Sequence, residues 1–334
     1  MIHKLRLHLA GSDPEWIIGQ ADLDGWDVQT QDAVVILGVA RADALQTYIG
    51  VDGHATVGEF RPPPSHNVRL HLFHLAHAIN RVAAFLETHP QKRLGLYASP
   101  MFQGEPMGGH LHLSVQFHDP KFFPVFNQAN LLRYRGRDVS LSPQKKISVP
   151  EPLIGLATAY RQAECEPLVF TGDWILSLLQ TLLVPWEYAI QPWHARRDRH
   201  AHYGQDHDII RWGDSVRPGT VPPEWSYCHL EYRTPSTWLK SPRLAYSYLG
   251  LLKFAILNWR ILSEFSPKLP PLESRIDAEK CFRAFWEHVR TQAPRYTPDL
   301  VALDDALKSL LENRRSDMNP HSPIDIPAWR RLLG

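Results

Sequence analysis

Short runs in which apolar and polar residues alternate occupy most of the first half of the chain and predict β-strands there. Turn-forming Gly, Asp and Pro residues separate these runs, which cover residues 3–9, 33–39, 48–51, 57–61, 93–98 and 110–117. One helix interrupts them, with Ser65 or Asn67 as its N-cap. Its apolar residues recur at helical spacing: Val68, Leu72, Leu75, Ile79, Val82 and Leu86.

The second half of the chain carries mostly helical patterns. Apolar periodicity predicts helices over residues 173–188, 244–262, 278–291 and 298–311, while an alternating run at 227–233 predicts one late strand. This order predicts an α+β fold, in which a curved, mostly antiparallel sheet carries helices on its outer face. We expect one domain over residues 1–334, of which 240–334 form a helical C-terminal part.

Composition and charge exclude several classes of protein. With 44% hydrophobic and 21% charged residues the chain is globular, and 36 Lys and Arg against 35 Asp and Glu argue against extensive contact with duplex nucleic acid. The longest apolar stretch, 244–262, contains Lys253 and Arg260, so we expect no membrane span. The N-terminus lacks a secretory pattern and the three cysteines lie far apart, which favours a reducing cytoplasm.

Ionisable residues gather on one face of several predicted strands. Successive strand side chains point to opposite faces, so each face follows directly from the sequence. The strand at 110–117 carries His110 and His112 opposite its apolar residues, and the strand at 227–233 carries His229, Glu231 and Arg233 on one face. If these strands belong to one sheet, their polar faces form a single charged surface.

Five further charged residues extend this pattern in the first part of the chain. Glu59 and Arg61 share a face of the strand at 57–61, and Asp52 precedes the Gly53 turn before it. Asp13 and Glu15 are again two residues apart, at the end of the first predicted strand. We therefore expect Asp13, Glu15, Asp52, Glu59, His110 and Glu231 to converge, together with His112, Arg61 and Arg233.

The chemistry of this set favours hard divalent cations. Carboxylates held close together repel each other unless cations lie between them, because each raises the pKa of its neighbours. A set rich in oxygen with few nitrogens suits Mg²⁺ or Mn²⁺ better than Zn²⁺, and nearby arginines suit phosphate. The pattern indicates phosphoryl transfer from ATP. The alternative is an ordinary half-solvated sheet, whose outward face is also polar.

The same residues carry a resemblance to a known family. The series Asp13-Pro-Glu15, Asp52-Gly-x5-Glu59-x-Arg61-Pro62, Gly109-His-x-His112-x-Ser114 and Glu231-Tyr-Arg-x-Pro235 spans residues 11 to 236. In order and spacing it resembles the motifs of the glutamine synthetase-like superfamily, and within it the phage-type carboxylate-amine ligases, or amidoligases. The resemblance implies a glutamine synthetase-like catalytic sheet.

The resemblance also implies roles for single residues. It makes Asp13, Glu15, Asp52, Glu59, His110 and Glu231 the ligands of Mg²⁺ or Mn²⁺. His112 and Arg233 match groups that face the transferred phosphate, and with Glu59 they form the expected catalytic set. Asp13 and Asp52 stand where glutamine synthetase itself has Glu, which shortens their reach by one methylene group.

An arginine-rich segment lies between the two motif strands. The resemblance implies that it contacts the nucleotide phosphate or a substrate carboxylate, as Arg61 also does; the alternative is a solvated basic loop. Its arginines are Arg196, Arg197, Arg199 and Arg211. Histidines in the same region have no thiolate beside them, which disfavours zinc. On the helix at 66–88, we expect His71, His74 and His77 to form a solvent-facing row.

The function implied is an ATP- and Mg²⁺-dependent, ADP-forming ligase that joins a carboxylate to an amine through an acyl phosphate. Its partners would be a small-molecule or peptide carboxylate and an amine, and the sequence leaves the substrates and the oligomeric state open. Two alternatives stay open as well. One is a phosphotransferase that acts on a guanidine or another nitrogen, and the other is a catalytically silent nucleotide-binding relative.

Overall fold

The computed structural model describes residues 5–21, 28–30, 48–51, 57–63, 65, 67–88, 94–99, 101–102, 105–117, 131–134, 137–140, 182–190, 210–212, 226–233, 235–258, 275–292, 297–312 and 322–334. The predicted strand at 33–39 and the start of the predicted helix at 173–188 lie outside these residues. No helix within the described ranges is long and apolar enough to cross a membrane.

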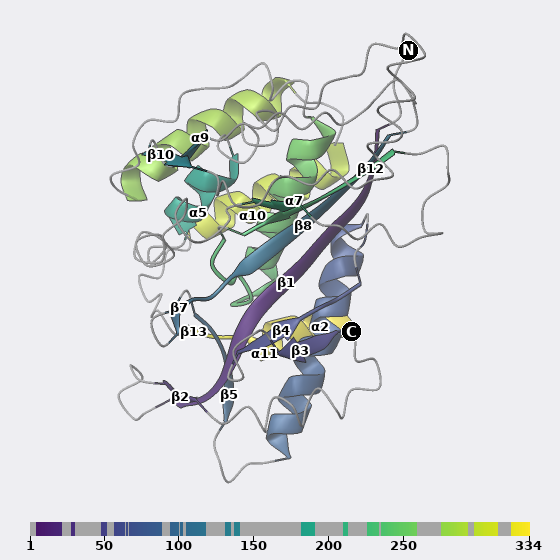
Figure 1. Cartoon of the computed structure of the whole chain (residues 1–334), viewed down its shortest axis with the longest axis vertical. Helices are drawn as coiled ribbons and strands as arrows, with labels where there is room; N and C mark the ends of the chain where they lie inside the picture. Colours follow the sequence, from purple (N-terminus) through teal and green to yellow (C-terminus); the bar gives the residue numbers. More distant parts are fainter. Residues whose placement is uncertain are drawn as a thin grey trace.

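A nine-stranded sheet forms the centre of the molecule (Figure 1). Its main path runs β11-β12-β8-β1-β4-β3, and every pairing in it is antiparallel. These strands are β11 (Ile210–Trp212), β12 (Ser226–Tyr232), β8 (Gly109–Phe117), β1 (Leu5–Ala21), β4 (Gly58–Phe60) and β3 (Ile49–Val51). The antiparallel sheet with its helices confirms the predicted α+β class.

Short strands complete the β-structure. The second half of β1 pairs with β2 (Val28–Thr30) and β5 (Gly95–Ala98), and β13 (Ser322–Pro323) pairs with β5. Two separate hairpins join β6 (Met101–Phe102) to β7 (Glu105–Pro106) and β9 (Leu131–Tyr134) to β10 (Arg137–Ser140). Strand β1 is therefore the one element that contacts β2, β4, β5 and β8.

The first strand is much longer than the sequence predicts. The prediction ended it near Asp13, whereas β1 continues through Pro14 and Glu15 to Ala21. Two causes override the turn signal: the Glu15 amide donates to the Gly108 carbonyl at 2.9 Å, and the Trp16, Ile17 and Ile18 side chains are buried. Asp13 and Glu15 consequently lie in the middle of the sheet and not at its edge.

Helix α2 (Val68–Glu87) begins where the sequence predicts it. Asn67 is its N-cap, because the Asn67 side-chain oxygen accepts hydrogen bonds from the Arg69 and Leu70 amides at 2.9 and 3.3 Å. The helix packs against β1, β4 and β5 and against helix α7 (Pro242–Leu257). Its buried face and the sheet enclose the core, in which Trp16 stacks on Phe60.

Most of the remaining helices gather around α7, and the last short helix packs on α2 (Figure 1). Helix α5 (Val184–Ile190) packs on α9 (Arg275–Gln292), and α10 (Thr297–Glu312) packs on α7. Short helix α11 (Ile326–Arg330) is followed by the 3-10 turn Arg331–Leu333. Fully buried Trp329 donates to the Leu239 carbonyl at 2.9 Å, which ties the end of the chain to the core.

Removing the N-cap of α2 should destabilise the protein measurably. We expect Asn67→Ala to lower the free energy of unfolding by about 1 kcal/mol, because two amide donors lose their acceptor. Urea denaturation of the variant and the parent measures the difference. Asn67→Asp keeps a side-chain acceptor and should retain nearly all the stability; an equal loss in both variants would contradict the capping role.

Candidate functional site

The strand register brings the predicted motifs onto four neighbouring strands. On β1 and β4, Glu15 lies directly opposite Glu59. On β1 and β8, Asp13 lies opposite His110 and Gly11 opposite His112. On β8 and β12, His112 lies opposite Glu231. Segments separated by up to about two hundred residues thus meet in a continuous row across β4, β1, β8 and β12, as the alternation pattern predicts.

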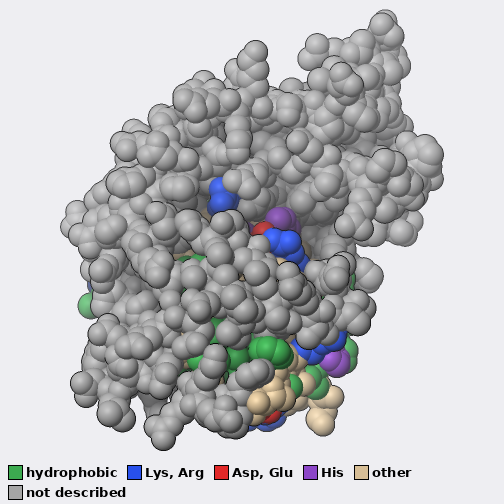
Figure 2. Space-filling view, turned by 60° about the horizontal axis from the view of Figure 1, so that its bottom comes forward, with side chains coloured by type: hydrophobic (Ala, Val, Ile, Leu, Met, Phe, Trp, Pro, Cys, Tyr) green, Lys and Arg blue, Asp and Glu red, His purple; other side chains and the backbone are tan. Residues whose placement is uncertain are grey.

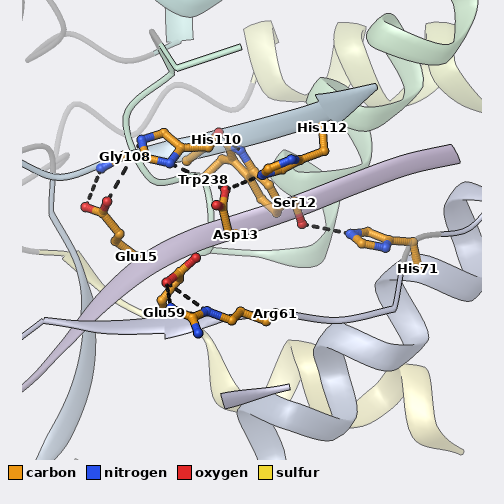
Figure 3. A network of polar contacts seen from close by, with 11 residues as sticks. Ser12, Asp13, Glu15, Glu59, Arg61, His71, Gly108, His110, His112 and Trp238 are labelled. Carbon is orange, nitrogen blue, oxygen red and sulfur yellow. Dashed lines mark hydrogen bonds and ion pairs between the residues drawn. The ribbon is translucent and has the colours of Figure 1, made fainter. Parts of the chain in front are cut away.

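Asp13 lies between two imidazoles in the middle of this row (Figure 3). Its Oδ1 atom is 3.0 Å from Nε2 of His112 and 3.4 Å from Nδ1 of His110. The Asp13 side chain is only 20% exposed, so this charge contact is largely shielded from water. Because His110 and His112 both face Asp13, their predicted common face on β8 is confirmed.

Glu15 is held by the backbone of the segment before β8. Its Oε2 atom accepts a hydrogen bond from the Gly108 amide at 2.6 Å, and its Oε1 atom is 3.9 Å from Nε2 of His110. A side chain at residue 108 would collide with the His110 ring, so glycine permits this close approach. At the next residue, the Trp238 indole donates to the Gly109 carbonyl at 2.9 Å and supports the strand.

Glu59 is paired with an arginine that directly follows its strand. Its Oε2 atom accepts hydrogen bonds from Nε and Nη2 of Arg61 at 2.9 and 2.5 Å. The Arg61 guanidinium is half exposed and lies over Gly50 of β3, where an added side-chain carbon would meet it at 2.8 Å. The predicted same-face pairing of Glu59 and Arg61 is therefore confirmed.

Burial and neighbouring charges act in opposite directions at Asp13 and His110. Burial works to raise the pKa of Asp13, but His112 and His110 outweigh it and hold that pKa well below its usual range. Burial works to lower the pKa of His110, but contact with Asp13, with a smaller contribution from Glu15, raises that pKa. The pair therefore favours an ionised carboxylate beside a protonated imidazole.

Glu59 behaves differently from Asp13. Burial raises the pKa of Glu59 from 4.5 to about 7, and the charge of Asp13 adds to this effect. The hydrogen bonds from Arg61 oppose the shift without cancelling it. The Glu59 carboxyl is thus partly protonated near neutral pH, because burial disfavours its charged form.

The described side chains contain no group of three His, Cys, Asp or Glu arranged to hold a metal ion as they stand. Protein donors occupy the acids instead: the two histidines contact Asp13, Gly108 donates to Glu15, and Arg61 donates to Glu59. The donor chemistry nevertheless fits a hard divalent cation, since three carboxylates and an imidazole lie on adjacent strands.

Several predicted site residues are placed only in part. Asp52, Arg196, Arg197 and Arg199 lie outside the described residues. For Arg211 and Glu231 the backbone is described, and they pair with each other across β11 and β12. Arg233 follows β12, is half-buried, and its charge acts to lower the pKa of His110, which places it near the histidines.

The prediction for His71 is wrong. The sequence pattern placed it in a solvent-facing row, but His71 is fully buried, while His77 is exposed and His74 is partly buried. The spacing indicates this burial, because residue 71 falls three positions after Val68 and four before Leu75, both on the apolar face. The sequence pattern also gave no indication of Ser12, which lies next to Asp13 and contacts His71.

Basic, acidic and histidine side chains gather near the middle of one face of the molecule (Figure 2). Among the described residues, the charged groups with close contacts in the site lie on β1, β4 and β8 or directly after β4: Asp13, Glu15, Glu59, Arg61, His110 and His112. Both signs of charge therefore meet within one site.

Comparisons with known proteins found solved structures that are similar to this chain. No protein-family model matches the sequence, and no curated protein matches it. The chain is similar to one in the crystal structure of the complex between prokaryotic ubiquitin-like protein Pup and its ligase PafA, with 12% identity and a TM-score of 0.49. That alignment covers 94% of this chain and 66% of the other.

The second similar structure is the crystal structure of a novel glutamine synthase homolog. It shares 16% identity with this chain at a TM-score of 0.40, and the alignment covers 98% of this chain and 71% of the other. With both TM-scores below 0.5, neither similarity assigns a function to the chain.

Neutralising Glu59 should stabilise the protein in the absence of a divalent cation. The folded-state pKa of about 7 exceeds the ordinary 4.5, so the parent loses stability as pH rises between these values. We expect Glu59→Gln to match the parent below about pH 4.5 and to exceed it by up to roughly 3 kcal/mol above pH 7. Thermal unfolding with EDTA across this range measures the effect.

The matched control for this prediction is Glu312→Gln, at an exposed position at the end of α10. It removes one carboxylate without touching the site and should not reproduce the pH dependence. A Glu59→Gln variant that is equally destabilised at pH 5 and pH 8 would contradict the raised pKa of Glu59.

A side chain at residue 108 should displace His110. We expect Gly108→Ala to lower the free energy of unfolding by about 1–3 kcal/mol, the usual cost of overpacking, because the added methyl group collides with the imidazole. The His110 ring signals in NMR spectra should move by more than those of exposed His77. Unchanged His110 signals would contradict the close approach.

Proposed function

We propose that the protein is an ATP-dependent carboxylate-amine ligase of the glutamine synthetase-like superfamily. The observation that carries the proposal is that buried Glu15 and Glu59 and half-buried Asp13 lie side by side on β1 and β4, against His110 and His112 of β8. Like charges placed opposite each other destabilise a sheet, and a bound cation would remove that destabilisation. The motif order in the sequence supports the same assignment.

The proposed cation ligands are Asp13, Glu15, Asp52, Glu59, His110 and Glu231. Mg²⁺ held there would supply charge neutralisation and alignment for the β- and γ-phosphates of ATP. Mg²⁺ usually keeps waters and phosphate oxygens among its ligands, so it needs only some of these side chains. Arg61 could then turn from Glu59 towards a phosphate, since its guanidinium is half exposed.

The cationic side chains would act on the transferred phosphoryl group. His112 and Arg233 would donate hydrogen bonds to its oxygens, and Arg211 together with Arg196, Arg197 and Arg199 would hold the nucleotide phosphates or a substrate carboxylate. The contact between Asp13 and His112 keeps the imidazole oriented. These residues position and stabilise charge, and no protein nucleophile is required.

The reaction proceeds in two steps. A carboxylate oxygen attacks the γ-phosphorus of ATP, the bond from that phosphorus to the β–γ bridging oxygen breaks, and ADP leaves. The amine then attacks the carbonyl carbon of the acyl phosphate, the C–O bond breaks, and inorganic phosphate leaves as the nitrogen gives up a proton. The substrates would be a peptide or small-molecule carboxylate and an amine. A reducing cytoplasm suits the three distant cysteines.

Hydroxylamine trapping tests the ligase assignment. With ATP, Mg²⁺ and a panel of amino acids and peptides, we expect ADP release and an acyl hydroxamate when hydroxylamine replaces the amine. Glu59→Gln and Glu231→Gln should lower both products at least tenfold, since a lost metal ligand or its support costs about that much or more. EDTA should abolish them, and Glu312→Gln should leave them unchanged.

The other outcomes separate the alternatives. ADP formed with a phosphorylated nitrogen product and no hydroxamate would identify a phosphotransferase. Binding of Mg²⁺-ATP without turnover of any carboxylate in the panel would identify a silent nucleotide-binding relative. Magnesium-dependent ATP binding and turnover that are unaffected by Glu59→Gln and Glu231→Gln would refute the assignment of the site itself.

A further inference from the structure

We propose that Ser12 and His71 are positioning residues, which fix Asp13 relative to Glu59 and Arg61 from the helix side of the sheet. In this role they determine how tightly the carboxylate cluster binds a divalent cation; that consequence rests on the proposed function. Neither residue belongs to the predicted motifs. The evidence is two hydrogen bonds of the His71 ring, one buried and one part-buried, that join α2 to both acid-bearing segments.

The His71 ring makes one hydrogen bond from each nitrogen. Its Nε2 atom is 2.7 Å from the Ser12 hydroxyl, and its Nδ1 atom is 3.1 Å from the Pro63 carbonyl oxygen. A carbonyl oxygen can only accept, so Nδ1 carries the proton. In a neutral ring Nε2 then accepts from the Ser12 hydroxyl. Burial lowers the pKa of His71 to about 4, which agrees with a neutral ring.

The two bonded groups belong to the two segments that carry the acids. Ser12 directly precedes Asp13 on β1, and Figure 3 shows its hydroxyl turned toward α2 and the His71 ring. Pro63 follows β4, two residues after Arg61 and four after Glu59. The imidazole therefore connects the side chain of Ser12, next to Asp13, to the carbonyl of Pro63, beyond Glu59. The size of the ring sets the separation of the two segments.

The surroundings make this connection rigid. The imidazole is fully buried on the face of α2 that also carries buried Leu72 and Leu75. Pro62 and Pro63 restrict the segment that accepts its bond, and the Arg61 amide is tied to the Tyr48 carbonyl at 2.8 Å. Ser12 is 5% exposed, so its bond to His71 cannot easily be exchanged for one to water.

A buried histidine at this position lowers the stability of the fold, unless its hydrogen bonds are needed to position the neighbouring segments. An apolar side chain would fill the same space without the desolvation of an imidazole, a hydroxyl and a carbonyl. Fully satisfied buried polar networks fix one arrangement of their neighbours, which apolar contacts do less strictly. Side chains that orient metal ligands typically change metal affinity by about 10- to 100-fold when removed. Ser12 and His71 occupy that kind of position behind Asp13.

The test compares two serine-to-alanine variants with similar structural costs. Ser12→Ala removes the hydroxyl that donates to His71. Ser247→Ala is the matched control, because the Ser247 hydroxyl is also fully buried and makes two hydrogen bonds, with Trp186 and Leu244, in the helical layer. We expect Ser12→Ala to weaken Mn²⁺ binding, measured by calorimetry at pH 8, by about tenfold or more. Ser247→Ala should leave Mn²⁺ affinity unchanged.

A second readout needs no metal. The ring signals of His110 and His112 in NMR spectra report the position of Asp13, and we expect them to move in Ser12→Ala but not in Ser247→Ala. Ser12→Thr keeps the hydroxyl and should restore them. Should Ser12→Ala fail to fold, His71→Asn serves instead, because its shorter side chain loses the contact with Ser12.

The outcomes distinguish the inference from the proposed function. If the histidine signals move but the parent binds no Mn²⁺, the positioning role stands and the proposed function fails. If the histidine signals and Mn²⁺ affinity of Ser12→Ala equal those of the parent, the positioning role is refuted. Equal effects of Ser12→Ala and Ser247→Ala also refute it, because the loss is then one of general stability.

Discussion

The cross-strand opposition of Glu15 and Glu59 is the constraint to which the rest of the site responds. Like charges directly opposite in an antiparallel pair destabilise a sheet, and here both carboxylates are buried with Asp13 two residues away. The protein compensates with a separate donor for each acid. Two imidazoles contact Asp13, a backbone amide binds Glu15, and a guanidinium binds Glu59. Charge compensation within the chain therefore keeps the acids in place.

This compensation is incomplete at Glu59, where the pKa stays near 7. The balance between burial, which raises this pKa, and Arg61, which opposes the rise, costs stability when Glu59 is ionised. Such a balance is typical of functional sites, where stability is given up for binding. The same balance explains why the described side chains form no ready-made three-ligand group, since the donors already occupy the carboxylates.

The frame around the acids is as important as the acids themselves. Strand β1 runs through the centre of the sheet and contacts the strands on both sides, so a shift in β1 would move Asp13 and Glu15 together. Gly108 leaves room for the His110 ring and Gly109 leaves room for Trp238, whose indole donates to the Gly109 carbonyl. On the helix side, the Ser12–His71 connection holds the same strand against α2. Apolar packing thus places the sheet, and polar contacts set the fine position of the acids.

The sequence by itself determined the α+β class, the limits of α2 and the grouping of Asp13, Glu15, Glu59, His110 and His112, because strand alternation and helical spacing are local properties. The tertiary structure decided the rest. It extended β1 through Asp13 and Pro14, since partners on both sides can override a local turn signal, and it placed Glu15 opposite Glu59, since register depends on pairing between distant strands. It also placed buried His71 against Ser12, because only the packing of α2 on the sheet decides which strand residue the imidazole meets.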